Sequence, residues 1–285
     1  MRKTSRAEEK FFRVLMFFST VFIAISLFLI VLSILYKGLP ALSWEMLTQE
    51  PKGGFYFGKE GGILNAILGS FYLAIGASIL AMLISIPVAL FINVHLRKYK
   101  KTTNFIRFLL DLMWGVPSIV YGAFAFGIMI YLGLRTSLLA GIVTVTLFII
   151  PIMIRSFDEV LKTVPIGLLE SSFSLGATLS ETSYRVVLRQ CVPGFITSIL
   201  LSFGRAIGDA AAVMFTAGFT DSIPTSLNQP AATLPLSIFF QLSSPIPEVK
   251  ARAYTSALVL TVIILLISIF ARYFSRKYAK HKIRF

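Results

Sequence analysis

Two ionisable residues interrupt an otherwise apolar stretch in the C-terminal third of the chain. Residues 195–218 read FITSILLSFGRAIGDAAAVMFTAG, and Arg205 and Asp209 are their charged members. A charge near the middle of a membrane-spanning helix costs about 2.5 to 3.5 kcal/mol to insert, so it normally faces a bundle interior or a wet cavity. We therefore expect Arg205 and Asp209 to line a pathway across the membrane. The alternative is an ion pair that only locks helices together, although a cation four residues before an anion is the weaker helical order.

The composition indicates that this stretch belongs to a membrane protein. The 285 residues are 56% hydrophobic and 14% charged, and the mean hydropathy is +0.82, which is higher than in soluble globular domains. A helix needs roughly 20 mostly apolar residues to cross a hydrocarbon core. Such runs predict an all-α integral membrane fold, with a single domain over residues 1–285 and six transmembrane helices. The expected spans are about 13–36, 64–94, 108–132, 137–154, 195–218 and 254–270.

The formal charge of +14 could indicate nucleic-acid binding, but the positions of the cations indicate a membrane topology instead. Lys and Arg gather at the N-terminus, in the second and fourth loops between the expected spans, and in the C-terminal tail. Cytoplasmic loops of membrane proteins carry such an excess of Lys and Arg. We therefore expect a multi-pass inner (plasma) membrane protein that contacts lipid and no nucleic acid, with both termini and the loop 155–193 in the cytoplasm.

A possible nucleotide site fails on inspection. The segment from Gly53 to Glu60 reads GGFYFGKE and imitates a phosphate-binding loop, but Glu60 stands where Ser or Thr would hold magnesium, and no strand-to-helix context surrounds it. We therefore expect no catalytic residue in this chain, and any ATP hydrolysis must occur on a partner. His95 and His281 are far apart and lack companion ligands, so we expect no metal site either.

The loop 155–193 carries the most specific pattern in the chain. Its run ESSFSLGATLSETSYRVVLRQCVPG resembles the EAA loop of ABC-importer permeases, in which Glu-Ala-Ala precedes a Gly and a later Ile-x-Leu-Pro. The matching residues are Glu170, Gly176, Ala177, Val186 and Leu188; serines replace the two alanines and Arg189 replaces the proline. The resemblance implies a cytoplasmic coupling helix that docks into an ATPase subunit. The alternative is a generic helix-turn-helix on the membrane surface.

Other stretches narrow the resemblance to the PstA family of phosphate importer permeases. These stretches are GGILNAILGS at 61–70, WGVPSIVYG at 114–122, GRAIGDAAAVMFTAG at 204–218 and TLPLSIFF at 233–240. The resemblance covers nearly the whole chain, and its specificity comes from several motifs that occur in order, since the EAA loop alone would indicate only the importer class. One departure concerns the expected pathway, where that family usually has Glu-Thr and this sequence has Asp209 and Ala210.

The resemblance implies an ABC importer type I permease fold and a particular assembly. The partners would be a related PstC-like permease, a PstB-like ATPase dimer that binds ATP and magnesium, and a PstS-like phosphate-binding protein. This chain would bind no cofactor and would form half of an alternating-access pathway for inorganic phosphate. Arg205 would attract the anion, because a guanidinium can pair with two phosphate oxygens. Asp209 would keep the site from holding the anion too tightly.

Two alternatives to phosphate import remain open from the sequence. The nearer one is a permease for another oxyanion, such as sulfate, molybdate or phosphonate, which only the family motifs disfavour. The more distant one is a stand-alone channel or ion-coupled carrier. Such carriers often contain inverted repeats with broken helices, and the sequence has no clear internal duplication.

Overall fold

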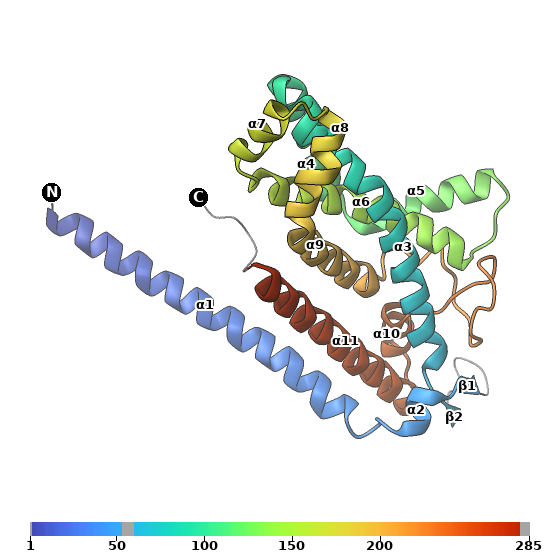
Figure 1. The fold of residues 1–285 in the computed structure, drawn as a ribbon. Coiled ribbons are helices and arrows are strands. Elements are labelled where there is room, and N and C mark those ends of the chain that lie inside the picture. The colour runs from blue at the N-terminus through green and yellow to red at the C-terminus, as the bar shows by residue number, and fades with distance from the viewer. Residues whose placement is uncertain (1, 53–59, 280–285) are drawn as a thin grey trace.

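The computed structural model describes residues 2–52 and 60–279, and most of them belong to helices (Figure 1). The nucleotide-like residues Gly53, Gly58 and Lys59 and the distant His281 lie outside the described residues. The long helices are α1 (Arg2–Gly38), α3 (Leu64–Leu90), α6 (Leu138–Lys162), α9 (Leu188–Gly208) and α11 (Pro247–Ala279). The shorter elements are α2 (Trp44–Thr48), β1 (Pro51–Lys52), β2 (Glu60–Gly61), the π-helix η1 (Phe91–His95), the 3-10 helix η2 (Leu96–Lys98), α4 (Lys100–Gly115), α5 (Ser118–Tyr131), α7 (Ile166–Ser174), α8 (Leu179–Glu181), the π-helix η3 (Thr182–Val187) and α10 (Leu234–Leu242).

The centre of the bundle is the pair of helices α3 and α6, which pack more extensively than any other pair of described elements. The buried positions of α3 include Ala74, Ala77 and Ala81, which are fully shielded from solvent. Such small side chains let two helix backbones approach closely in a membrane domain. Larger side chains of α6, among them Val145 and Ile149, complete the buried interface. Helix α9 packs against both, and α11 packs against α9.

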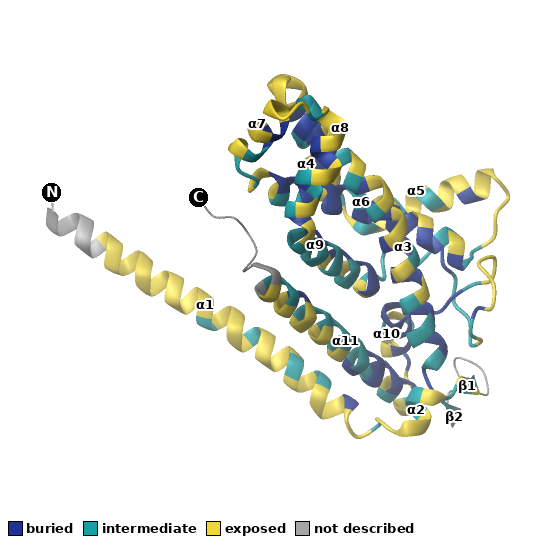
Figure 2. Ribbon diagram, viewed as in Figure 1, coloured by how far each residue is buried: buried dark blue, intermediate teal, exposed yellow. Residues whose placement is uncertain are grey.

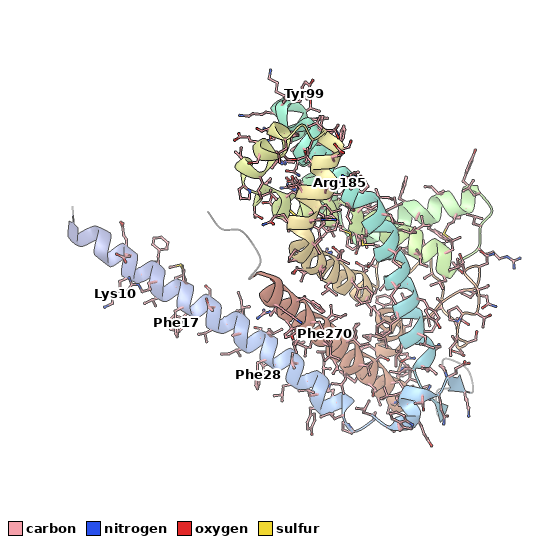
Figure 3. The ribbon with its side chains drawn as sticks, viewed as in Figure 1. Lys10, Phe17, Phe28, Tyr99, Arg185 and Phe270 are labelled. Carbon is pink, nitrogen blue, oxygen red and sulfur yellow. The ribbon has the colours of Figure 1, made fainter. Side chains whose placement is uncertain are left out.

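Helix α1 lies apart from this body and touches it mainly through α11 (Figure 1). Its most apolar stretch is unburied, as the yellow ribbon in Figure 2 shows. Phe17 and Phe28 project from it with 65% and 64% of their surface exposed (Figure 3). A helix with apolar side chains all round is stable only in lipid or against other apolar helices. This surface therefore belongs in a membrane or against another subunit.

The expected third span, 108–132, is not one straight helix. It corresponds to α4 and α5, which meet at an angle of 90°. Helix α4 ends at Gly115, and Pro117 is the N-cap of α5. A proline disfavours helical geometry in the preceding residue, and Val116 is accordingly extended, with φ −70° and ψ 127°. By length and hydropathy, the described residues contain five helices that can cross a membrane, or six if this bent pair counts as one.

The expected fifth span, 195–218, is also corrected. Helix α9 ends at Gly208, and Asp209 is extended, with φ −87° and ψ 122°. Residues 209–233 contain turns and irregular segments but no helix. At the other end, α6 runs on to Lys162 and α9 begins at Leu188, so the expected loop 155–193 shortens to a segment over 163–187.

Candidate functional site

Arg205 lies in the last turn of α9, with its side chain exposed on the surface of this subunit. The guanidinium carbon stands 5.0 Å from the centre of the Phe148 ring on α6. Phe148 is only 2% exposed, and its ring also makes an edge contact with Tyr121. Within the described part of the chain, no carboxylate forms an ion pair with Arg205. The aromatic ring therefore supports one face of the guanidinium by a cation–π contact, and its N–H groups stay available.

The expected ion pair between Arg205 and Asp209 does not form. Because α9 ends at Gly208, the two residues no longer share one helical face. The Asp209 carboxylate instead accepts a hydrogen bond from the backbone N–H of Ala212 at 2.8 Å. Such a bond from a side chain to the backbone three residues on stabilises a turn. The geometry therefore does not support the alternative in which Arg205 and Asp209 form an ion pair that only locks helices together. Asp209 instead orders the chain that follows the helix.

Four of the sequence motifs meet around the irregular segment 209–233. In the motif at 61–70, the Asn65 side chain donates to the carbonyl of Thr220 at 2.7 Å, and the Ser70 hydroxyl accepts from the N–H of Leu234 at 2.8 Å. In the motif at 114–122, a Cβ on Gly122 would stand only 2.7 Å from the carbonyl oxygen of Ala212, so a side chain there would collide with the backbone. The four motifs therefore build one structural unit beside the end of α9. Sequence reasoning assigned no role to Asn65 or Ser70.

The segment 163–187 forms a helix-turn-helix that contains four of the five expected coupling residues. The fifth, Leu188, is the first residue of α9. Glu170 is exposed on α7, and Ala177 and Val186 are partly buried. Gly176 has φ +80°, a left-handed conformation that non-glycine residues adopt only with strain. Its N–H donates to the carbonyl of Phe173 at 2.9 Å and closes the end of α7.

The second half of this helix-turn-helix is fixed by local hydrogen bonds. The Thr178 side chain accepts from the N–H of Glu181, and the Glu181 carboxylate accepts from the N–H of Thr178, which is a capping box. The hydroxyls of Ser172 and Thr182 lie 2.9 Å apart and join the two halves across a buried contact. The segment is therefore a folded unit and not a loose loop.

Leu175 is the most exposed apolar side chain of this unit, with 88% of its surface free. It stands at the tip, immediately before the left-handed Gly176. Phe173 and Leu179, at 40% and 46% exposure, flank it. Sequence reasoning missed Leu175, although a leucine directly before a turn glycine was a usable signal. A small apolar knob of this kind fits a pocket on a partner protein.

A buried carboxylate lies at the base of the same unit. Asp158, near the end of α6, is fully shielded from solvent and binds three cations. Its oxygens lie 2.8 Å from Arg107 Nη2, 2.6 Å from Arg155 Nη1 and 3.1 Å from Lys162 Nζ. The Asn93 amide adds a hydrogen bond at 2.8 Å. These contacts tie η1, α4 and α6 together where the segment 163–187 begins.

Comparison with known proteins decides the family. A model of the binding-protein-dependent transport system inner membrane component matches residues 85–280, which include the end of α9 and the whole segment 163–187. The chain belongs to this family of membrane permeases. Its helices and this membership together make it a multi-pass protein of the inner membrane.

Individual relatives agree with this assignment. The chain is 32% identical over 248 residues to the phosphate transport system permease protein PstA of Pasteurella multocida, covering 86% of each protein. It is 31% identical to the protein of the same name from Haemophilus influenzae, again over 86% of each. Among solved structures, the MetNI methionine ABC transporter in an inward-facing form matches with a TM-score of 0.62 at 18% identity. That match covers 75% of this chain and 95% of the other, and it shows a shared permease fold.

Proposed function

We propose that this chain is a transmembrane permease subunit of an ATP-driven importer for inorganic phosphate and forms half of the translocation pathway. The observation that carries the proposal is an arginine without a carboxylate partner among the described residues, at the end of a spanning helix. It occurs in a chain 32% identical to a phosphate transport permease. Relatives in this family are transport subunits. In this proposal the chain itself catalyses no reaction, and a partner hydrolyses the ATP.

The chemistry of Arg205 suits a transported oxyanion. Phe148 supports the flat face of the guanidinium, so the N–H edges can form two parallel hydrogen bonds with two phosphate oxygens. In the proposed assembly, that edge faces a cavity shared with a PstC-like permease. Asp209 follows directly after the end of α9 and accepts a hydrogen bond from the Ala212 N–H, and in this proposal its negative charge limits how tightly the anion is retained.

The energy in this proposal comes from outside the chain. A PstB-like ATPase dimer binds ATP and magnesium, and a PstS-like phosphate-binding protein delivers the anion from the other face. We call the segment 163–187 the coupling segment, because in this proposal it docks onto the ATPase subunit. Leu175 is the apolar side chain that enters a pocket of the ATPase. Movement of this segment would be transmitted to α6 and α9, which continue directly from its two ends.

Leu175→Asp is expected to weaken binding of the ATPase subunit by about tenfold or more, because burial of a leucine side chain contributes roughly 1.5 to 3 kcal/mol. The measurement is copurification of the ATPase with the tagged permease. Leu175 is a cleaner probe than Gly176, since Gly176→Trp would also strain a backbone with φ +80°.

Leu227→Asp is the matched control for this substitution. Leu227 is also exposed, at 52%, and its carbonyl contacts the N-terminal end of α6, whereas the segment 163–187 follows the C-terminal end. This control should retain full ATPase binding. Undiminished ATPase binding by the Leu175→Asp variant would contradict the coupling assignment.

The orientation can be tested with single cysteines in a Cys191→Ala background, because Cys191 is the one cysteine of the sequence. In that background, cysteines at Lys52 and Glu248, both exposed, should react with a membrane-impermeant reagent added outside intact cells. A cysteine at Lys100 should react only after the membrane is permeabilised. The reverse pattern would place the segment 163–187 on the outside and contradict the topology.

The substrate is tested in cells that lack the gene for this chain. Deletion should abolish high-affinity uptake of radiolabelled phosphate and leave sulfate and molybdate uptake unchanged, and a plasmid copy should restore it. Loss of sulfate or molybdate uptake with normal phosphate uptake would show that another oxyanion is the substrate.

A further inference from the structure

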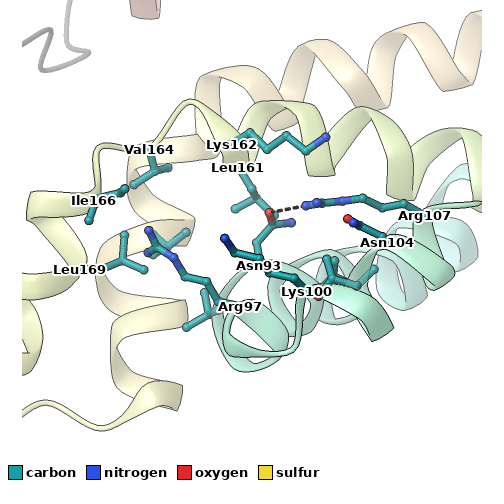
Figure 4. Close-up of a pocket in the computed structure, with 14 residues that line it drawn as sticks. Asn93, Arg97, Lys100, Asn104, Arg107, Leu161, Lys162, Val164, Ile166 and Leu169 are labelled. Carbon is teal, nitrogen blue, oxygen red and sulfur yellow. Dashed lines mark hydrogen bonds between the residues drawn. The ribbon is translucent and has the colours of Figure 1, made fainter.

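A cavity of about 380 Å³ lies beside the coupling segment, between the corner formed by η1, η2 and α4 and the start of α7 (Figure 4). Four cationic residues line it: Arg97, Lys100, Arg107 and Lys162. The amide of Asn104 adds a hydrogen-bond donor, whereas the amide nitrogen of Asn93 already donates to the Ala89 carbonyl and to Asp158. The lining includes neither Asp nor Glu. This cavity therefore carries a concentrated positive charge that the transport pathway does not use.

Carboxylates just outside the cavity neutralise two of its four cations: Asp158 binds Arg107 and Lys162, and Glu159 also contacts Lys162 at 2.7 Å. Arg107 donates from Nε and Nη2 to Asp158, while Nη1 has no partner among the described residues. Nη2 also donates to the Asn93 oxygen at 3.3 Å, the bond drawn as a dashed line in Figure 4. Arg97 and Lys100 are exposed at the cavity and form no ion pair within the described ranges. Arg107 is thus held by Asp158 and Asn93 in the cavity wall, and the same wall carries two cations, Arg97 and Lys100, without an ion pair among the described residues.

We propose that this cavity binds a phosphate group, carried either by inorganic phosphate or by the headgroup of an anionic phospholipid. Guanidinium and ammonium groups together with amide donors are the side chains that bind phosphate oxygens. The volume is at the lower end for small-molecule sites, which suits a compact anion. Basic pockets between the helices of membrane proteins accept lipid headgroups by the same chemistry.

The site is separate from Arg205 and adjoins the coupling segment. Val187 lines the cavity, and Arg205 lies 18 residues further along, so the two are roughly 27 Å apart for helical geometry. Ile166 and Leu169 of α7 form another part of the wall. A bound phosphate group would bridge cations of η2, α4 and α6 next to α7, and its occupancy would therefore fix the position of the coupling segment.

The test compares two double variants of the purified full-length chain. Arg97→Gln with Lys100→Gln removes two cavity cations, whereas Lys98→Gln with Lys101→Gln removes two exposed cations of the same corner that do not line the cavity. Both are made in an Arg205→Gln background, which removes the proposed pathway contact. Binding of radiolabelled inorganic phosphate is measured in delipidated detergent, and retention of phosphatidylglycerol is measured by native mass spectrometry from phosphatidylcholine nanodiscs containing it.

The cavity pair should weaken binding about tenfold, and the control pair should leave it nearly unchanged, because only the former contributes charge-assisted hydrogen bonds. Saturable binding of inorganic phosphate identifies the free anion as ligand; retention of phosphatidylglycerol that inorganic phosphate cannot displace identifies the lipid. Thermal unfolding should be the same for both pairs, since all four side chains are exposed. Equal losses in the two pairs, or no binding of either ligand in the Arg205→Gln background, would overturn the proposal.

Discussion

Arg205→Gln is expected to reduce ATP-driven phosphate uptake at least about tenfold while the subunit still inserts and assembles. Glutamine keeps polarity and most of the length, but it removes the charge and the paired N–H donors. Hydrogen bonds to charged groups contribute roughly 1.5 to 3 kcal/mol, which corresponds to about ten- to hundredfold in rate or affinity. The measurement is initial phosphate uptake together with copurification of the partner subunits.

Two comparisons separate a substrate role from a structural one. Arg135→Gln removes an exposed arginine from the irregular connection before α6 and should leave uptake unchanged. The double variant Arg205→Gln with Asp209→Asn should stay as defective as the single one, because Asp209 binds the Ala212 N–H and not Arg205. Recovery of uptake in the double variant would mean that the two charges only compensate each other, and the pathway assignment would be lost.

Asp158→Asn should lower the free energy of unfolding of the subunit by about 3 kcal/mol or more. Removal of one partner from a buried ion pair leaves uncompensated charge, which typically costs roughly 3 to 5 kcal/mol. Here the substitution leaves Arg107, Arg155 and Lys162 without their shared buried carboxylate. Denaturant unfolding of the detergent-solubilised chain, followed by circular dichroism, measures the change.

The neighbouring carboxylate is the control for this prediction. Glu159 also contacts Arg155 and Lys162, at 3.5 and 2.7 Å, but its side chain is 61% exposed. Exposed ion pairs contribute less than about 1 kcal/mol, so Glu159→Gln should be nearly neutral. If both substitutions had the same small effect, Asp158 would not anchor the start of the segment 163–187.

Long apolar runs made much of the fold predictable. The expected span 64–94 corresponds to α3 and η1, which together cover Leu64 to His95. Hydropathy succeeds here because only a helix can satisfy its own backbone hydrogen bonds within lipid. The motif in the segment 163–187 coincides with a folded helix-turn-helix, in which Gly176 adopts the positive φ that only glycine tolerates without strain. The coupling role of this segment stays a prediction.

The end of α9 was not predictable from hydropathy. The sequence after Asp209 is as apolar as the sequence before Arg205, so nothing in its composition separates helix from buried irregular chain. Asn65 holds the irregular segment and Ser70 holds the start of α10 directly after it, and their partners lie 155 and 164 residues away along the chain. Local pattern reasoning has no access to contacts of that range.

The buried charge network was missed for a related reason. Asp158 was expected in the cytoplasmic loop 155–193, because the fourth span was expected to end at residue 154. The helix instead runs on to Lys162, and cations from α4 and α6 converge on the carboxylate. Its burial depends on that packing, which no single stretch of sequence encodes.

The central claim is tested most directly by transport in a purified system. The chain is reconstituted into liposomes with its partner permease and ATPase, with ATP enclosed where the ATPase faces the lumen and the phosphate-binding protein added outside. The account predicts phosphate accumulation that requires ATP, the ATPase and the binding protein, and that excess sulfate or molybdate does not inhibit. Phosphate entry that proceeds equally without ATP or the ATPase would contradict the account and identify the chain as a channel or carrier.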